Sequence, residues 1–201
     1  MTEKKKYPTQ CNMADIIKPT PGTKLNLGCS SRKFHGWINI DAREEVGPDV
    51  IDNVFTLSNF EKSSVDVIYA SHLLEHVKRK EVKNVLSRWF ELLKPKGVLR
   101  LSVPDFEKIV KYYLLTSDLE KLHGLLHAGQ RNEYDIHYVT FDFKLLKRLL
   151  VEVGFVEENI RIYSFNETEH FFIDDGSQAY LPHMDKVNGM LMSLNVEAIK
   201  R

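Results

Sequence analysis

The chain has 201 residues, and its 28 lysine and arginine residues balance its 28 aspartate and glutamate residues, so the formal net charge is zero. This balance gives no support for a broad nucleic-acid or membrane-binding surface, and no apolar run reaches the ~18 residues of a membrane span. Cys11 and Cys29 have no spacing signature, which is typical of a reducing compartment and predicts a cytoplasmic protein. We expect one domain over residues 1–201, with residues 1–10 flexible.

Hydrophobic periodicity predicts a series of strands and one long helix in the first half of the chain. A short helix is expected at 11–18, where the following prolines would end it. Strands are expected at 24–27, 37–40, 49–52 and 65–70. Ser71 can cap the next helix, which should continue to about Leu93 and stop at the proline and glycine that follow.

The second half continues with a strand at 98–103 and an irregular insertion at 105–140. The insertion holds helical stretches near 106–115 and 119–127, and we expect it to cover the ligand crevice as a lid or acceptor site. Thr140 can cap a further helix that Gly154 ends. The last predicted elements are strands at 159–165 and 193–199, paired as an antiparallel edge, with a loop at 166–192 between them. The pattern predicts an α/β fold in which helices flank a sheet.

A glycine and an acid stand where two neighbouring parallel strands would end. Gly28 follows the first predicted strand, and Asp41 comes at the end of the second. Ligands of open parallel sheets bind beyond these strand ends, so the pair is placed to hold a nucleoside-like ligand, with Asp41 accepting hydrogen bonds from ribose hydroxyls. Asp41 follows Gly28 by only thirteen positions, and the glycine pattern of a dinucleotide site is absent. This spacing favours a ribose-bearing ligand without phosphates, such as S-adenosylmethionine.

The motifs LNLGC and GWINID resemble the first two motifs of class I S-adenosylmethionine-dependent methyltransferases, and the compact bacterial "type 11" group in particular. The later segments DVIYASHLLEHV, LLKPKGVLRLSVPD and IHYVTFDFKLLKRLLVEVGF extend the similarity over most of the chain. The resemblance implies a Rossmann-like, doubly wound, three-layer αβα fold with about seven strands. These would be mostly parallel, with an antiparallel C-terminal edge hairpin. Ser30 departs from the family, which usually has glycine there.

The resemblance also implies the cofactor, S-adenosylmethionine, and the residues that would hold it. Asp52 and Asn53 would correspond to the adenine contacts of the family, with Val54 packing on the ring. Ala70 and Ser71 would lie where the fourth strand approaches the methionine portion, and a small residue there leaves room. The expected cofactor-binding residues are Leu27, Gly28, Cys29, Ser30, Asp41, Asp52, Asn53, Val54, Ala70 and Ser71.

Methyl transfer from a sulfonium is an in-line displacement, so the protein mainly has to align the acceptor with the methyl carbon. A base is needed only when the acceptor must lose a proton, as a hydroxyl does. His72, Asp105 and His137 are the candidate bases, and together with Tyr138 they are expected to line the acceptor site. We expect a small-molecule or glycan-type acceptor, no nucleic-acid partner, and a monomer or homodimer.

Two alternatives remain open at this point. His72, Glu75 and His76 match the H-x-x-E-H pattern of some zinc hydrolases, which would place both histidines on one helix face. The resemblance instead predicts that Glu75 and His76 are polar residues of a first helical turn and that no resident metal is present. His123 and His127 are also four residues apart, and a solvent or lid-packing role is expected for them. The second alternative is a cofactor-binding protein that has lost catalysis.

Overall fold

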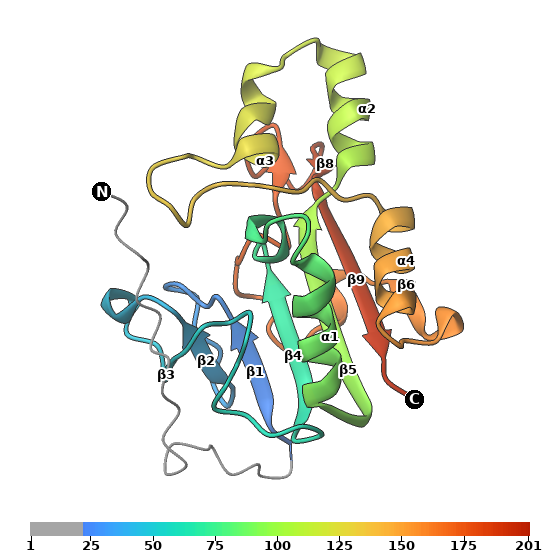
Figure 1. Cartoon of the computed structure of the whole chain (residues 1–201). Helices are drawn as coiled ribbons and strands as arrows, with labels where there is room; N and C mark the ends of the chain where they lie inside the picture. Colours follow the sequence, from blue (N-terminus) through green and yellow to red (C-terminus); the bar gives the residue numbers. More distant parts are fainter. Residues whose placement is uncertain (1–21) are drawn as a thin grey trace.

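The computed structural model of the protein describes residues 22–201, and its centre is one seven-stranded sheet (Figure 1). The strands are β1 (Lys24–Leu27), β2 (Ile38–Asp41), β3 (Val50–Ile51), β4 (Val65–Ser71), β5 (Leu93–Pro104), β6 (Ile160–Ile162) and β9 (Ser193–Ile199). Their order across the sheet is β3-β2-β1-β4-β5-β9-β6. The first five strands are parallel, and β9 runs antiparallel to both β5 and β6, which confirms the predicted fold class. The predicted helix at 11–18 and flexible segment at 1–10 lie outside the described residues.

Helices α1 (Val82–Leu92) and α4 (Phe143–Glu152) cover one face of the sheet (Figure 1). Side chains alternate across a strand, so Leu25 and Leu27 of β1 enter the core on this side together with Ile68 of β4. They pack in one cluster with Leu86 and Trp89 of α1, which are fully buried. This hydrophobic face holds the sheet rigid beneath the strand tips.

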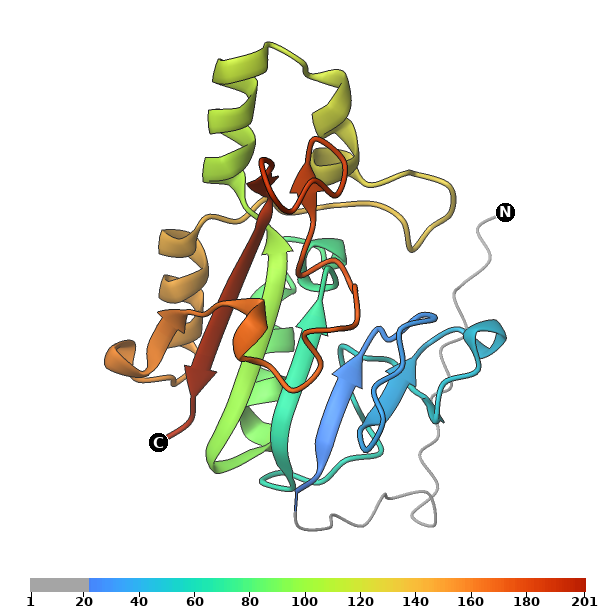
Figure 2. The same ribbon diagram turned by 180° about the vertical axis from the view of Figure 1, so that it is seen from behind.

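The opposite face is covered by the irregular segment between β6 and β9 rather than by long helices (Figure 2). Phe34, Trp37 and Tyr69 form a buried aromatic cluster there, and His170 stacks on Phe34 with ring centroids 4.0 Å apart. Phe34 and Trp37 belong to the connection between β1 and β2. The aromatic cluster therefore fixes the connection that carries the glycine turn.

The predicted helix beginning at Ser71 is wrong in its first half. β4 extends to Ser71, whose hydroxyl donates to the main-chain oxygen of Asp175 at 2.8 Å instead of capping a helix. His72 follows with φ +48°, a left-handed conformation that no α-helix contains. Only a 3-10 turn, η3 (Leu74–His76), precedes α1. Buried apolar residues of η3 and of α1 together gave a helical spacing over the whole segment, so the sequence pattern overestimated the length of the helix.

Other boundaries also differ from the sequence prediction. α4 is capped by Asp142, whose carboxylate accepts from the Leu145 amide at 2.6 Å, and not by Thr140. β5 begins at Leu93, through the stretch that we expected to be a turn. The expected loop at 166–192 contains the small hairpin β7 (Tyr180–Leu181) and β8 (Met190–Leu191). Further short 3-10 turns are η2 (Glu44–Val46), η5 (Glu157–Asn159) and η6 (Phe165–Glu167).

The insertion after β5 has the two predicted helical stretches, α2 (Phe106–Thr116) and η4 (Glu120–Leu122) continuing into α3 (His123–His127). Both rise beyond the carboxyl ends of the parallel strands (Figure 1). Ile109 and Tyr112 of α2 form a small separate core with Leu122 and Met192. Within residues 22–201, no helix is long and apolar enough to cross a membrane.

We expect His170 to make the stability of the protein depend on pH. The side chain is 4% exposed, both of its ring nitrogens lack hydrogen-bond partners, and burial lowers its pKa to about 4 despite the nearby Asp175 and Glu169. The unfolded chain binds a proton at this residue below about pH 6.5, whereas the folded chain does not, so stability is lost as the pH falls towards 4. Between pH 7 and pH 5, the free energy of unfolding of His170→Phe should fall by about 1–2 kcal/mol less than that of the wild type, measured by urea unfolding. Equal losses in both proteins would contradict the assignment.

Candidate functional site

The turn after β1 is bonded directly to the end of β2. Leu27 of β1 pairs with Ile40 of β2, which places Gly28 beside Asp41. The Cys29 amide donates to the Ile40 carbonyl oxygen at 3.1 Å, and the Ser30 amide donates to Oδ2 of Asp41 at 2.9 Å. The glycine turn and the carboxylate therefore form one unit at the tips of two parallel strands, as the sequence predicted.

Two positions in this turn adopt left-handed backbone conformations. Gly28 has φ +64°, and a Cβ atom added to it would lie 2.9 Å from Cδ1 of Leu73. Ser30 has φ +46°, a conformation that glycine adopts without strain, which gives a physical reason why the methyltransferases that the chain resembles usually have glycine at this position. Leu73 lies between the end of β4 and η3, so the absence of a side chain at Gly28 lets the segment after β4 approach the turn after β1.

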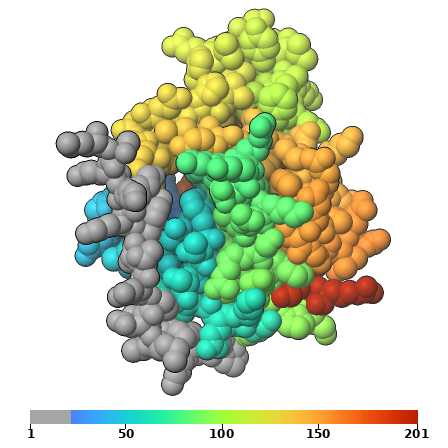
Figure 3. Space-filling model, in the orientation of Figure 1, coloured from blue at the N-terminus to red at the C-terminus, as the bar shows by residue number. Residues whose placement is uncertain are grey.

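A cleft of about 990 Å³ opens at these strand tips. Its volume is in the range of sites that hold a whole small ligand or cofactor. The sequence-predicted residues that line it are Leu27, Gly28, Cys29, Ser30, Asp41, Asn53, Val54, Ser71, His72 and Tyr138. Figure 3 shows a hollow below the yellow atoms of the segment after α3, which lie over the strand ends.

Both oxygens of Asp41 accept hydrogen bonds inside the protein. Oδ1 accepts from the Arg43 amide at 3.0 Å and from Arg43 Nε at 3.1 Å, while Arg43 Nη2 lies 3.3 Å from Oδ2. With the Ser30 amide also on Oδ2, the lone pairs of the carboxylate are filled. Ribose hydroxyls would have to replace the Arg43 side chain, whereas the two amides can remain and hold the carboxylate in position.

Cys29 lies beside this carboxylate but has no reactive thiol. Its side chain is buried, and burial together with the charge of Asp41 raises the pKa of the thiol to about 11. The thiol is the weakly nucleophilic form at neutral pH. Cys29 therefore contributes its small size and its amide to the turn.

Four predicted site residues do not line the cleft: Asp52, Ala70, Asp105 and His137. The Asp52 carboxylate accepts hydrogen bonds from the Asn53 and Asn59 amides and therefore stabilises the loop that follows β3. Asp105 caps α2 by accepting from the Glu107 and Lys108 amides, which explains why it is not aimed at a ligand. His137 instead packs against His76, with ring centroids 4.7 Å apart.

A buried carboxyl group lies behind the wall of the cleft. Glu75 is fully buried in η3, and burial raises its pKa to about 8. His72 Nδ1 lies 3.4 Å from Oε1 of Glu75, and burial lowers the pKa of His72 to about 4. His72 and His76 are not on one face of an α-helix, because His72 is left-handed and η3 is a single 3-10 turn, so the helical geometry of the hydrolase pattern is wrong.

The structure adds cleft residues that the sequence did not indicate. Arg43 follows Asp41 by two positions, and Asp175 arrives from the long segment between β6 and β9, where its main-chain oxygen accepts from Ser71. Arg131 and Tyr134 come from the loop after α3. The loop after α3 belongs to the insertion that we expected to cover the crevice. Asp175 belongs to the separate segment 166–192, where nothing in the sequence pattern indicated this residue.

The family of the chain follows from comparison with known proteins. Residues 13–158, more than half of the chain, match the family model described as a methyltransferase domain, and the chain belongs to this family. The predicted methyltransferase class is thereby confirmed, and S-adenosylmethionine is the cofactor of enzymes of this class, as the resemblance implied. No curated protein matches the chain.

Solved structures share the fold at low sequence identity. A Methanosarcina mazei SAM-dependent methyltransferase is 20% identical, with 96% of this chain and 97% of that one covered and a TM-score of 0.54. A Thermotoga maritima SAM-dependent methyltransferase, described as a possible histamine N-methyltransferase, is 15% identical. The match covers 90% of this chain and 84% of that one, with a TM-score of 0.58. Haemonchus contortus phosphoethanolamine N-methyltransferase 2, in complex with S-adenosylmethionine, is 12% identical. The match covers 90% of this chain and 49% of that one, with a TM-score of 0.51. These similarities support the Rossmann-like fold.

The left-handed turn generates a prediction about stability. Gly28→Ala should destabilise the protein by about 1–2 kcal/mol, because alanine is strained at positive φ and its Cβ would meet Leu73. Ser30→Gly is the matched control, since it removes a side chain at a second left-handed position and should be neutral or slightly stabilising. Chemical denaturation measures both, and a Gly28→Ala variant as stable as the wild type would contradict the assigned conformation.

Proposed function

We propose that this protein transfers the methyl group of S-adenosylmethionine to a small hydroxyl-bearing or glycan-type acceptor bound in the 990 Å³ cleft. The observation that carries the proposal is the pairing of the left-handed Gly28 turn with the Asp41 carboxylate at adjacent parallel strand tips. The two elements leave room for an adenosine and offer acceptors to its ribose. We place the reaction in the cytoplasm, which agrees with a free buried thiol at Cys29.

The cofactor would lie across the tips of β1 and β2. Asp41 would accept hydrogen bonds from the ribose hydroxyls after the half-buried Arg43 side chain moves away into solvent. Asn53 and Val54 line the same side of the cleft, where an adenine ring would lie. The methionine end would extend along Gly28 towards Ser71 and His72, which places the methyl group beneath the loop after α3.

The acceptor end of the cleft is polar and aromatic. Tyr134 and Tyr138 line it with Arg131, whose guanidinium is paired with Asp135 at 2.7 Å. Aromatic faces and paired charges suit a ring that carries hydroxyl groups, because they provide stacking and hydrogen bonds without a large net charge. The insertion at 105–140 would act as the lid over this acceptor.

His72 is the candidate base that remains at the cleft. Its side chain lines the cleft, and its Nε2 atom lies 3.0 Å from Oγ of Ser193, which orients the ring. Burial keeps the imidazole neutral at pH 7, but Ser193 Oγ donates to the Gly176 carbonyl oxygen and therefore accepts the hydrogen of Nε2, which leaves the only free lone pair on Nδ1, beside buried Glu75. A hydroxyl acceptor would therefore need further activation beyond His72.

Cofactor binding can be tested with S-adenosylhomocysteine in calorimetry. Asp41→Asn should bind it about 10- to 100-fold more weakly, because hydrogen bonds to a charged acceptor contribute about 1.5–3 kcal/mol. Glu44→Gln is the matched control, since it removes the same charge from the exposed η2 turn outside the cleft. An Asp41→Asn variant with wild-type affinity would refute the ribose assignment.

Catalysis can be tested by following S-adenosylhomocysteine release from S-adenosylmethionine by mass spectrometry. We expect release above background with hydroxylated small molecules or saccharides, and none with RNA or DNA, because the chain has no net positive charge. A protein that binds the cofactor but releases no product with any of these acceptors would instead be a binding protein, and turnover with nucleic acid would contradict the acceptor class.

A further inference from the structure

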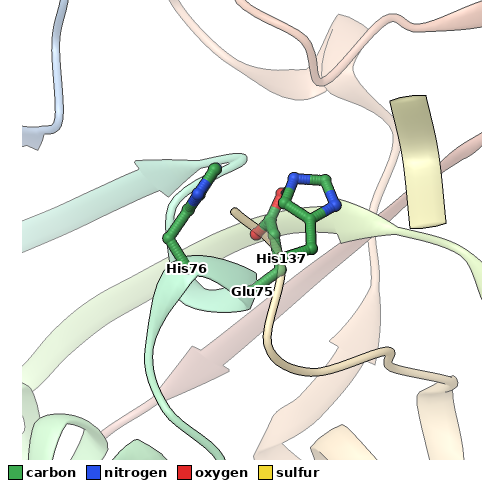
Figure 4. Close-up of side chains that lie close together, drawn as sticks. All are labelled: Glu75, His76 and His137. Carbon is green, nitrogen blue, oxygen red and sulfur yellow. Dashed lines mark ion pairs between the residues drawn. The ribbon is translucent and has the colours of Figure 1, made fainter. Parts of the chain in front are cut away.

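Three potential metal ligands meet behind the cleft. Glu75 and His76 come from η3, and His137 comes from the segment that precedes α4 (Figure 4). One ligand atom from each of the three lies within 4.8 Å of the others, and His137 Nε2 is 3.8 Å from Oε1 of Glu75. The Tyr138 amide donates to the Glu75 main-chain oxygen at 2.8 Å, so the two segments are joined beside the cluster.

The hydrogen bonds of the two histidines decide which nitrogen is free. His76 Nδ1 is 3.1 Å from the Ile136 carbonyl oxygen, and His137 Nδ1 is 2.9 Å from the Leu125 carbonyl oxygen. A carbonyl oxygen can only accept, so each Nδ1 carries the hydrogen. The Nε2 atom of each neutral ring therefore has a free lone pair. Histidines that bind metals are oriented in this way, with the second nitrogen donating to an oxygen.

Glu75 supplies an independent observation. Its side chain is fully buried, and neither carboxyl oxygen has a hydrogen-bond partner. A buried carboxyl group without partners is costly, and such groups are usually paired or bound to metals. Among residues 22–201, these are the ligand-type side chains that converge closely enough to hold an ion.

His72 does not relieve this deficit. Ser193 Oγ donates to the Gly176 carbonyl oxygen at 2.6 Å, so the same hydroxyl accepts from Nε2 of His72. The Nδ1 atom of His72 is then unprotonated as it faces Glu75 at 3.4 Å. When Glu75 is ionised, its carboxylate faces the lone pairs of His72 Nδ1 and His137 Nε2 and has no hydrogen-bond partner, which is the environment that a cation would complete.

We propose that Glu75, His76 and His137 bind one divalent transition-metal ion of the zinc class in the wall of the cleft. Two imidazole nitrogens and one carboxylate form a common three-ligand set for zinc, with metal–ligand distances of about 2.0–2.2 Å and a fourth position left open. His76 also lines the cleft, so the open position would face it. The proposal revises our expectation of no resident metal and differs from the hydrolase pattern, because His72 is engaged by Ser193 and His137 takes its place.

The proposal predicts selective loss of zinc binding in Glu75→Gln. Full-length protein without a polyhistidine tag is stripped with a chelator and titrated with Zn²⁺ in calorimetry, and bound metal is counted by elemental analysis. The wild type should bind one equivalent, and Glu75→Gln should bind at least about 100-fold more weakly, because even outer partners of a metal ligand are worth about 10- to 100-fold. His137→Gln should give the same loss.

The controls separate a metal site from a folding defect. A glutamine amide at position 75 can donate to a free Nε2, so the metal-free variant should keep the melting temperature of the metal-free wild type, and Zn²⁺ should raise only the wild-type value. The exposed pair His123 and His127 is the matched control, and its double alanine variant should retain the stoichiometric site. Absence of one bound equivalent in the wild type, or equal affinity in Glu75→Gln, would overturn the proposal and leave a proton shared with Glu75 in its place.

Discussion

The register between β1 and β2 is the constraint on which the site depends. Because Leu27 pairs with Ile40, the left-handed turn at Gly28 is brought beside Asp41, and the Ser30 amide reaches the carboxylate. A shift by one residue would turn Asp41 towards the other face of the sheet. The buried apolar face below and the aromatic cluster above both hold this register, so packing far from the ligand determines the geometry of the ligand site.

The antiparallel strand β9 explains how the acceptor end is assembled. It pairs with β5 along its whole length, from Ser193 beside Pro104 to Ile199 beside Val98. The chain that enters β9 must therefore pass the carboxyl ends of β4 and β5. There the main-chain oxygen of Asp175 accepts a hydrogen bond from the Ser71 hydroxyl, and the Ser193 hydroxyl orients the His72 ring. Residues distant in sequence from the cofactor motifs thus complete the cleft and position the histidine beside Glu75.

Local patterns predicted the parts of the molecule that depend on local sequence. Gly28 and Asp41 were predictable because each ends a short strand and the spacing between them limits the connection. Asp105 was misassigned because a residue at a strand tip can equally cap the next helix, and in the structure its carboxylate accepts from amides of α2. Asp175 and the tautomers of His72 and His137 depend on contacts across more than a hundred residues or on single carbonyl groups, which no periodicity records.

The most direct test of this account is a crystal structure with S-adenosylhomocysteine bound. We predict that both ribose hydroxyl oxygens lie about 2.5–2.8 Å from the Asp41 carboxylate oxygens, with the adenosine between the Gly28 turn and the tip of β2 and the Arg43 guanidinium displaced. A ligand bound elsewhere, or a ribose separated from a carboxylate that Arg43 still holds, would contradict the account.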